Sequence, residues 1–367
     1  MIRLINYKKG FRIVSIALDK HTKEDLAEDK IDFLYVSDGK VELYPEGERL
    51  EADARVFDEL TRCNNYDVFE LWDNGALYKC YDHSSIENYF FVTGKCNSNC
   101  IMCPSSDFSR RRAGEANIQK LIEIARHIPT SVRHMTITGG EPFMAGEEIF
   151  ELFKFLNDKY DLTEFLILTN GRIFSVDRYV LKFSETMPRY SLVGIPLHGS
   201  TPAKHDAITR SENSFIQTVI GLKKLLALKV PIELRLVVCD LNINDFENMA
   251  EMICRDFPTV SHVSIMAVEM TGNARKNAKE VWIPYSWAFN KIAPAVKYLI
   301  NNGINVKLYN FPLCTVWREF WLLCEKSIST EKVRFAEVCK VCNYSSSCGG
   351  VFAGTFSLEK NDLRAVL

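Results

Sequence analysis

Residues 89–106 read YFFVTGKCNSNCIMCPSS, an apolar run followed directly by three cysteines at the spacing CxxxCxxC. The run at 89–93 is aromatic and β-branched, which predicts a strand with the cysteines on the loop after it. At this spacing the thiolates of Cys96, Cys100 and Cys103 can converge on one small inorganic group. A closed zinc or iron–sulfur site normally has four protein ligands, so three leave one metal position for a substrate or cofactor. The alternative is a zinc knuckle with a distant fourth ligand.

Beyond this loop, short apolar runs alternate with segments of helical periodicity, the pattern of repeated βα units and a parallel sheet. Six strands are expected, at 89–93, 134–138, 165–169, 192–197, 232–238 and 262–267. The helices expected between them lie at 118–127, 147–158, 214–228 and 245–254, with Asp245 as the N-cap of the last. We therefore predict an α/β fold with a partial (β/α)6 barrel, whose chemistry gathers at the carboxyl ends of the strands.

Two further regions flank the barrel, which we place at 89–275. Residues 1–88 are rich in β-branched and aromatic residues, and Asp38-Gly39 between two alternating runs predicts a hairpin, so we expect a small β-rich N-terminal module. Residues 276–367 begin with a long helix at 285–301 and continue as a cysteine-rich extension.

Composition limits the choice of partners and compartment. Forty-five basic and 47 acidic residues give a net charge of -2, which favours neither nucleic acid nor an anionic membrane as a partner. No run approaches the ~18 apolar residues that suggest a membrane span, so we expect a cytoplasmic protein. Twelve cysteines in a reducing compartment indicate metal binding or catalysis rather than disulfides.

Glycine-rich turns end the next two expected strands. Thr138-Gly139-Gly140-Glu141-Pro142 follows the second strand, where two glycines allow close approach of backbone to a ligand. Thr169-Asn170-Gly171 ends the third strand and reads equally well as an ordinary turn.

CxxxCxxC followed by GGEP resembles the radical SAM (S-adenosylmethionine) superfamily. The resemblance implies that Cys96, Cys100 and Cys103 bind a 4Fe-4S cluster whose open iron chelates SAM. It also implies that Thr138, Gly139, Gly140 and Glu141 contact the methionine amino group and that Asn170 lies beside SAM. In the family, reductive cleavage of SAM then gives a 5'-deoxyadenosyl radical that abstracts a substrate hydrogen.

The same resemblance implies roles for three further residues. Met102 stands where the family often has an aromatic residue near adenine. The segment GIPLHGSTPAKHDAITR (194–210) resembles a segment of peptide-modifying members, which makes Arg210 the expected partner of the SAM carboxylate. His198 is expected to face the ribose or the substrate, or to form only part of the pocket wall.

A second group of cysteines occupies the C-terminal extension. Cys339, Cys342 and Cys348 are closely spaced, and Cys314 would complete a four-cysteine site for a 4Fe-4S cluster or for zinc, with Cys324 as an alternative fourth ligand. The spacing resembles the SPASM or twitch extensions of radical SAM enzymes, which implies an auxiliary 4Fe-4S cluster. The isolated cysteines are interpreted as buried thiols: Cys63, Cys80, Cys239 and Cys254.

Several strings in the second half resemble the His-Xaa-Ser system radical SAM maturases, among them VEMTGNARKN (268–277) and GINVKLYNFPLC (303–314). This resemblance implies a ribosomally made precursor peptide as substrate and a paired second radical SAM protein as partner. A reductive reaction also implies an electron donor such as flavodoxin or ferredoxin.

Other functions remain open from the sequence. The chain could instead be a radical SAM enzyme acting on a small molecule or nucleotide, or a catalytically inactive iron–sulfur partner. The N-terminal module would either recognise a leader peptide by strand addition or cap the barrel.

Overall fold

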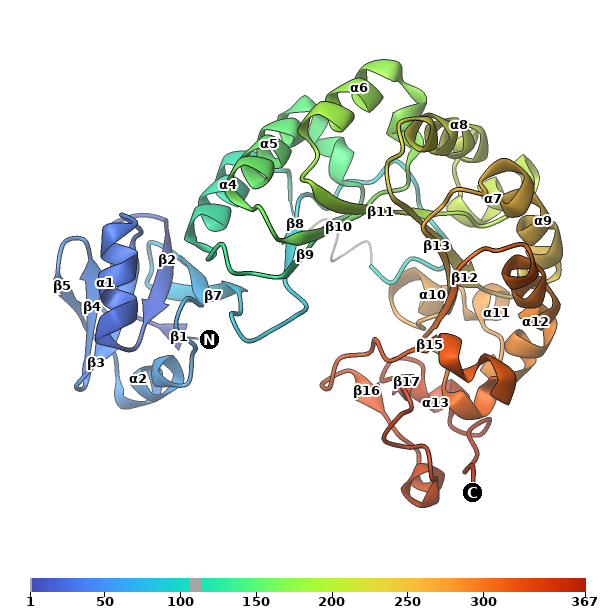
Figure 1. Ribbon diagram of the computed structural model, residues 1–367. Helices are drawn as coiled ribbons and strands as arrows, with labels where there is room; N and C mark the ends of the chain where they lie inside the picture. Colours follow the sequence, from blue (N-terminus) through green and yellow to red (C-terminus); the bar gives the residue numbers. More distant parts are fainter. Residues whose placement is uncertain (1, 106–113) are drawn as a thin grey trace.

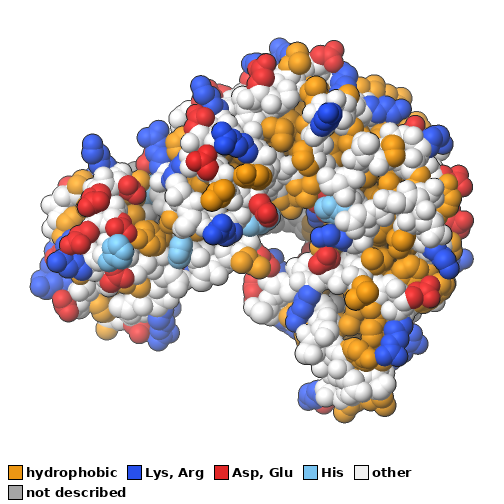
Figure 2. Space-filling model, in the orientation of Figure 1, with side chains coloured by type: hydrophobic (Ala, Val, Ile, Leu, Met, Phe, Trp, Pro, Cys, Tyr) orange, Lys and Arg blue, Asp and Glu red, His pale blue; other side chains and the backbone are white. Residues whose placement is uncertain are grey.

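Two sheets organise the chain in the computed structural model, which describes residues 2–105 and 114–367 (Figure 1). The larger sheet is curled into an open half-barrel at the centre of the molecule. The smaller sheet forms the N-terminal module at one side of it, and the C-terminal extension lies at the other side. Figure 2 shows the surface hollowed between these two flanking parts, with charged side chains of both signs around the opening.

The N-terminal module contains a seven-stranded sheet in the order β1-β7-β6-β2-β3-β4-β5. Its strands are β1 (Ile2–Arg3), β2 (Arg12–Ala17), β3 (Phe33–Ser37), β4 (Lys40–Tyr44), β5 (Glu48–Leu50), β6 (Val68–Leu71) and β7 (Ala76–Tyr81). The predicted hairpin is confirmed, because β3 and β4 are antiparallel and Asp38 and Gly39 have φ of +51° and +72°, as a tight primed turn requires. The two helices α1 (Lys20–Glu28) and α2 (Ala54–Thr61) were not predicted.

The central sheet is entirely parallel, and its eight strands follow one another in chain order from β8 to β15. They are β8 (Tyr89–Phe91), β9 (His134–Thr138), β10 (Glu164–Leu168), β11 (Tyr190–Pro196), β12 (Ile232–Val238), β13 (His262–Ala267), β14 (Val306–Tyr309) and β15 (Cys324–Glu325). The six predicted strands are confirmed, and β14 and β15 extend the sheet beyond them.

Helices cover the convex face of this sheet (Figure 1). The helices of this part are α4 (Ile118–His127), α5 (Ile149–Lys159), α6 (Asp177–Thr186), α7 (Pro202–Thr209), α8 (Ser214–Ala227), α9 (Phe246–Asp256), α10 (Gly272–Lys276), α11 (Ala278–Val281) and α12 (Tyr285–Asn301). Alternate strand residues such as Ile232, Leu234 and Leu236 point outward into the helices and form the main hydrophobic core. The other residues of each strand therefore face the concave side.

Asp245 directly precedes α9, as predicted, but its side chain does not cap the helix. The carboxylate instead accepts hydrogen bonds from the backbone N and Oγ of Ser200, at 2.6 and 2.8 Å, and pairs with Lys204. The prediction of a capping side chain was wrong because the loop after β11 lies closer to this carboxylate than the helix N–H groups do.

The N-terminal module is packed against α4 of the barrel. Ile13 and Val68 belong to the main hydrophobic core, and Ser15 Oγ lies 3.0 Å from His127 Nδ1 in a buried contact. Lys120 Nζ donates to Glu70 at 2.9 Å. The module and the barrel therefore share a continuous core.

The C-terminal extension contains the short strands β16 (Val333–Arg334) and β17 (Val351–Phe352) and the helix α13 (Phe356–Glu359). Two carboxylates attach it to the first turn of α12. Glu359 accepts from the backbone N of Tyr285 at 3.2 Å, and Asp362 accepts from the backbone N of Ser286 at 2.8 Å. In the described part of the chain, no helix is both long and apolar enough to cross a membrane.

Candidate active site

The cysteine loop leaves the carboxyl end of β8 and is bound by the glycine turn that ends β9. Gly140 N donates to Thr93 O and Glu141 N donates to Lys95 O, both at 2.8 Å. A Cβ atom on Gly139 would lie 2.6 Å from Thr93 O, and one on Gly140 would lie 2.4 Å from Lys95 O. The close approach that the two glycines were predicted to allow is therefore an approach to the cysteine loop.

Glu141 joins the ends of two neighbouring strands. Its carboxylate is buried and accepts hydrogen bonds from Thr169 Oγ1 at 2.8 Å and from the backbone N of Asn170 at 2.7 Å. Burial raises the pKa of this carboxyl, and the hydrogen bonds from Asn170 and Thr169 oppose that rise. A direct contact between Glu141 and a ligand stays a prediction.

Side chains at the end of β10 hold the start of the cysteine loop. Asn170 Nδ2 donates to Asn97 Oδ1 at 2.6 Å. Arg172 Nη1 donates to Asn97 O at 2.5 Å and to Ser98 Oγ at 3.0 Å. Asn170 was predicted to lie beside a ligand, whereas Arg172 was missed because nothing in its sequence neighbourhood marks it.

The opposite side of the loop is held by the segment after β13. Asn273 donates its side-chain amide to Cys100 O at 3.1 Å and its backbone N–H to Cys103 O at 2.9 Å. Asn277 donates its side-chain amide to Ile101 O at 3.0 Å. The two asparagines are four residues apart in VEMTGNARKN (268–277). The resemblance of this string to the His-Xaa-Ser system maturases did not predict the contact with the cysteine loop.

Gly272 begins this clamp in a conformation that a side chain would prevent. Its φ is +51°, and a Cβ atom there would lie 2.3 Å from Pro104 O. Only glycine allows the backbone of this segment to come so close to the cysteine loop. The loop is thus fixed from both sides, which pre-organises its three thiols.

Met102, Arg210 and His198 occupy three different environments. Met102 is buried, packs against Ile208 and Val268 in a small apolar cluster, and also lines the cavity described below. Arg210 is exposed, ends α7 with a φ of +51°, and donates Nη2 to Asn277 Oδ1 at 3.1 Å. Its contact with a SAM carboxylate stays a prediction.

His198 is buried just after the end of β11 and is not among the described residues that line the cavity. Its backbone N donates to His205 Nδ1 at 3.2 Å, and its own Nδ1 has no hydrogen-bond partner among the described residues. Burial, followed by the nearby His205, lowers the pKa of His198 well below its usual value, so the ring is neutral. Its predicted role toward ribose or substrate is untested.

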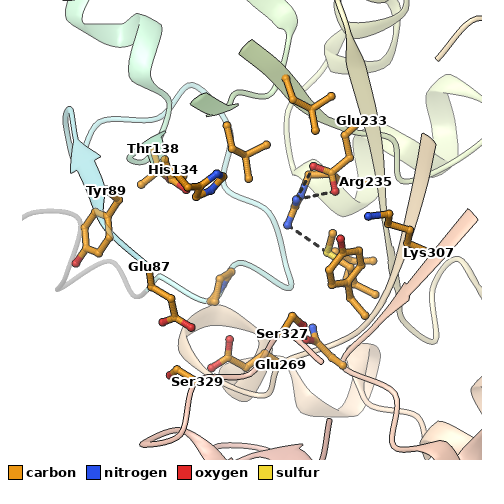
Figure 3. A pocket seen from close by; sticks show the side chains of 18 of the residues that line it. Glu87, Tyr89, His134, Thr138, Glu233, Arg235, Glu269, Lys307, Ser327 and Ser329 are labelled. Carbon is orange, nitrogen blue, oxygen red and sulfur yellow. Dashed lines mark hydrogen bonds and ion pairs between the residues drawn. The ribbon is translucent and has the colours of Figure 1, made fainter. Parts of the chain in front are cut away.

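A cavity of about 920 Å³ fills the concave side of the sheet next to the cysteine loop (Figure 3). Alternate residues of the strands line it, such as His134, Thr136 and Thr138 of β9. The opposite wall is charged and includes Glu233, Arg235 and Lys307, which Figure 3 shows pointing inward. Residues of the extension, including Ser327 and Ser329, complete the rim.

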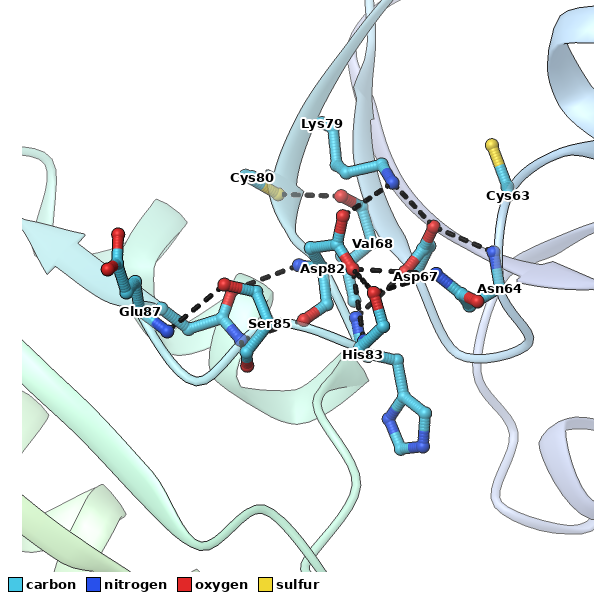
Figure 4. A network of polar contacts seen from close by, with 12 residues as sticks. Cys63, Asn64, Asp67, Val68, Lys79, Cys80, Asp82, His83, Ser85 and Glu87 are labelled. Atoms are coloured by element: carbon cyan, nitrogen blue, oxygen red, sulfur yellow. Dashed lines mark hydrogen bonds and ion pairs between the residues drawn. The ribbon is translucent and has the colours of Figure 1, made fainter. Parts of the chain in front are cut away.

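The linker from the N-terminal module forms another part of the rim, through Ile86, Glu87 and Tyr89. A polar network fixes this linker (Figure 4). Lys79 Nζ binds the carboxylates of Asp67 and Asp82 at 2.7 and 3.0 Å. Asn88 Nδ2 in turn donates to Asp82 O and Ser85 O, at 2.8 and 2.9 Å, so hydrogen bonds connect the rim to the module.

The four cysteines predicted for the second site line one small cavity in the extension: Cys314, Cys339, Cys342 and Cys348. Backbone N–H groups point at their sulfur atoms: Leu313 and Gly350 donate to Cys348 Sγ, and Val366 donates to Cys342 Sγ, each at 3.4 Å. Cys324 is not among the described residues that line this cavity.

Among residues 2–105 and 114–367, no three His, Cys, Asp or Glu side chains are placed so that they could hold a single metal ion. A four-iron cluster contains several metal ions, so its thiolates are separated more widely than the ligands of one ion. The N–H groups aimed at sulfur are a feature that tunes iron–sulfur clusters in proteins. The four thiols of the extension and the N–H groups aimed at them are compatible with a bound iron–sulfur cluster.

Of the isolated cysteines that were predicted to be buried, Cys239 is buried, whereas Cys63, Cys80 and Cys254 are only partly buried. Cys63 and Cys80 donate their thiols to backbone carbonyls of Glu59 and Val68, at 3.6 and 3.3 Å. Burial raises the pKa of Cys63 to about 11 and that of Cys80 to about 12. Such thiols are poor metal ligands and nucleophiles at neutral pH.

Comparisons with known proteins identify the barrel. Residues 90–253 match the profile of the radical SAM superfamily. SuiB of Streptococcus suis has a similar fold, with a TM-score of 0.51 at 13% identity over 68% of this chain and 54% of SuiB. SuiB bound to S-adenosylmethionine gives a TM-score of 0.51 at 14% identity over 66% of this chain and 53% of SuiB.

A third structure, SuiB bound to the precursor peptide SuiA, gives a TM-score of 0.49 at 13% identity over 61% of this chain and 48% of SuiB. This chain thus spans about half the length of the SuiB chains that it matches. No curated protein matches its sequence. The superfamily match covers the strands and loops that carry the cysteine triad, and the chain therefore contains a radical SAM domain at residues 90–253.

Proposed function

We propose that this chain is a radical SAM enzyme that modifies a ribosomally made precursor peptide. The observation that carries the proposal is the cysteine loop itself. Three thiols on one loop are clamped between the glycine turn after β9 and the asparagines after β13, at the edge of a large cavity. A loop fixed in this way, next to a cavity, suits a reactive group that must be aimed at a substrate.

In this proposal Cys96, Cys100 and Cys103 hold a 4Fe-4S cluster with one open iron for SAM. When bound, the cluster and SAM supply reductive cleavage to methionine and a 5'-deoxyadenosyl radical, which removes a substrate hydrogen. The backbone of Gly139 and Gly140 keeps the loop in place, and Met102 offers an apolar surface between loop and cavity. Asn170, His198 and Arg210 are proposed to complete the SAM site.

The extension is proposed to hold an auxiliary 4Fe-4S cluster of the SPASM or twitch kind. Its support is the shared cavity of Cys314, Cys339, Cys342 and Cys348 with N–H groups directed at sulfur. Four ligands would close this cluster, which favours peptide modification over a small-molecule reaction at an open second cluster. Zinc is the alternative occupant of the same four thiolates.

The proposed substrate is a precursor with His-Xaa-Ser repeats, and its support is the resemblance of residues 268–277 and 303–314 to the corresponding maturases. SuiB, which shares the fold, has been crystallised with a precursor peptide. The proposal includes an electron donor such as flavodoxin or ferredoxin, a paired second radical SAM protein and a cytoplasmic location. Neither nucleic acid nor a membrane is a proposed partner.

Release of 5'-deoxyadenosine tests the enzymatic proposal. The chain would be reconstituted with iron and sulfide under anaerobic conditions and incubated with SAM and a chemical reductant. We expect 5'-deoxyadenosine and methionine in equal amounts, detected by chromatography and mass spectrometry, and none when the reductant is omitted. An inactive iron–sulfur partner protein would bind iron and release no 5'-deoxyadenosine under any of these conditions.

Co-expression tests the substrate. A His-Xaa-Ser precursor would be produced with the chain and its paired radical SAM protein, and the mass of the peptide would be measured. A defined mass change that requires Cys96, Cys100 and Cys103 supports the proposal. A precursor of unchanged mass, together with active SAM cleavage, would redirect the search to small molecules or nucleotides.

A further inference from the structure

Two cationic side chains, Arg235 and Lys307, lie on the charged wall of the cavity, and the buried Ser264 is in register between them. Arg235 of β12 is paired in register with Ser264 of β13, and Ser264 is paired with Lys307 of β14. Residues paired in register on neighbouring parallel strands point to the same face of the sheet. Figure 3 shows the side chains of Arg235 and Lys307 directed into the cavity.

The guanidinium of Arg235 is held in one orientation by Glu233. Arg235 Nη1 lies 2.9 Å from both Oε1 and Oε2 of Glu233, whose carboxylate is buried. Burial would raise the pKa of Glu233, but His262 and Arg235 outweigh it and lower that pKa to about 2, so Glu233 is ionised. A Cβ atom on Gly194 would lie 3.0 Å from Arg235 Cδ, so this glycine leaves room for the pair.

The rest of the guanidinium faces the cavity. An arginine has five N–H donors, and the only other hydrogen bond of Arg235 in the described structure is from Nη2 to Met266 Sδ, at 3.5 Å. A thioether is a weak acceptor, so the Nη2 edge has unused donor capacity. The Ser264 hydroxyl is fully buried and does not line the cavity. It lies near enough to Glu233 to help lower the pKa of that carboxyl, so it supports the pair and is not available to a ligand.

Lys307 is the second cation, on the third strand. Its Nζ lies 3.3 Å from Glu325 Oε1, and both side chains are more than a third exposed. An exposed ion pair of this kind contributes little and exchanges easily with other partners. Lys307 can therefore turn from Glu325 to a ligand that also contacts the Nη2 edge of Arg235. The other described charged residues that line the cavity are Glu87, Glu164, Glu269 and Lys332.

We propose that Arg235 and Lys307 bind a carboxylate of the peptide substrate, and so determine which segment enters the cavity. This inference rests on the proposed function and names a substrate group for it. The two N–H donors on one edge of a guanidinium match the two oxygens of a carboxylate. A carboxylate is therefore favoured as the ligand over a neutral carboxamide. The carboxylate can come from an acidic side chain or from the C-terminus of the peptide.

Three blocked peptides separate these sources. The probes are acetyl-Gly-Glu-Gly-amide, acetyl-Gly-Gly-Gly with a free carboxylate, and the neutral acetyl-Gly-Gln-Gly-amide. Their binding to the reconstituted protein with SAM would be measured by ligand-observed NMR at low salt. We expect at least one carboxylate peptide to bind about tenfold more tightly than the Gln peptide, the size of one charge-assisted contact. Equal binding of all three peptides would overturn the inference.

Two variants test whether Arg235 and Lys307 cause the preference for the carboxylate peptide. R235K keeps the charge but loses the planar edge, and K307Q removes a partly exposed cation without disturbing the buried pair. We expect both to lose most of the preference for the carboxylate peptide, while affinity for the Gln peptide is unchanged. The matched control is K154Q, which removes a positive charge from the outer face of α5 and should keep the full preference.

A preference that survives in both R235K and K307Q would overturn the inference, because Arg235 and Lys307 would not be its source. Thermal unfolding of each variant confirms that it is folded. Release of 5'-deoxyadenosine by the unmodified protein without peptide is measured separately. The proposed enzymatic function fails if that release is absent, and the carboxylate site fails if only the peptide preference is absent.

Discussion

The two cysteine sites of this chain are built in opposite ways. The triad at Cys96, Cys100 and Cys103 lies on a loop whose backbone is clamped by residues from three different strand ends, beside a cavity of about 920 Å³. The group at Cys314, Cys339, Cys342 and Cys348 encloses a small cavity of its own, with N–H groups directed at its sulfur atoms. The first group thus borders a large cavity, whereas the second lines a small one.

The size of the neighbouring cavity explains why different groups surround the two sets of cysteines. A site that must admit a ligand has to hold its cysteines without covering them, and here the clamp bonds the backbone of the loop from both sides. A closed site can use all its protein ligands and gains from N–H groups that stabilise the thiolates. Each of the following changes is designed to separate the two sites.

Removing the triad should have the largest effect. In the variant with Cys96, Cys100 and Cys103 all replaced by Ala, we expect no SAM cleavage and a fall in bound iron from about eight to about four per chain. Iron analysis and 5'-deoxyadenosine release are the measurements, with C254A as a control that keeps both. Complete loss of iron would show that the extension does not hold an independent iron cluster.

The fourth ligand of the closed site is the next test. C314A should lose the iron of the extension and keep about four irons at the triad, because Cys314 lines the cavity with the other three cysteines. C324A should keep all the iron, since Cys324 does not line that cavity in the described structure. Iron content and the electron paramagnetic resonance spectrum of each reduced variant distinguish them. If C324A lost the iron of the extension and C314A kept it, Cys324 would be the fourth ligand.

Replacing one glycine beside each site by alanine tests how closely the neighbouring backbone packs there. In G140A the new Cβ would lie 2.4 Å from Lys95 O, so the cysteine loop must shift, at a cost of about 1–3 kcal/mol. We expect SAM cleavage to fall by about tenfold or more. G349A places its Cβ 3.5 Å from Glu325 O, an ordinary contact, and should leave the iron and the stability unchanged. Equal effects would contradict the clamp.

The asparagine clamp should give a smaller effect. N273A removes the side-chain hydrogen bond to Cys100 O and keeps the backbone bond to Cys103 O, so we expect a loss of about 1 kcal/mol in unfolding free energy. The apparent KM for SAM should change together with the spectrum of the triad cluster, while the signal of the extension stays constant. A change in the extension signal alone would place the role of Asn273 elsewhere.

The attachment of the extension should have the smallest effect on SAM cleavage and act instead on the dependence of stability on pH. Burial, with Asp362 nearby, raises the pKa of Glu359 to about 9. Between the unfolded value of 4.5 and this raised pKa, the folded state holds a proton that the unfolded state has released, so stability should fall as pH rises. E359Q should flatten that slope in urea unfolding, and the exposed control E337Q should not. An unchanged slope in E359Q would assign the proton to another group.

Much of the fold was predictable because its signals are local. The ends of α4, β12 and β13 agree with the prediction, since each has strong periodicity over its whole length. The hairpin at Asp38-Gly39 follows from turn chemistry alone. The strands β14 and β15 were missed because they are short and gain their place only by pairing with β13 and with each other.

The amino-acid sequence alone determined the chemistry of this protein, because thiol spacing and glycine turns after strands are properties of neighbouring residues. Only the tertiary structure decided how that chemistry is held and what it faces. The contacts of Arg172 and Asn273 with the cysteine loop, and the row from Arg235 to Lys307, join residues far apart in the chain. Such contacts depend on how the sheet curls, which the local pattern of the chain does not specify.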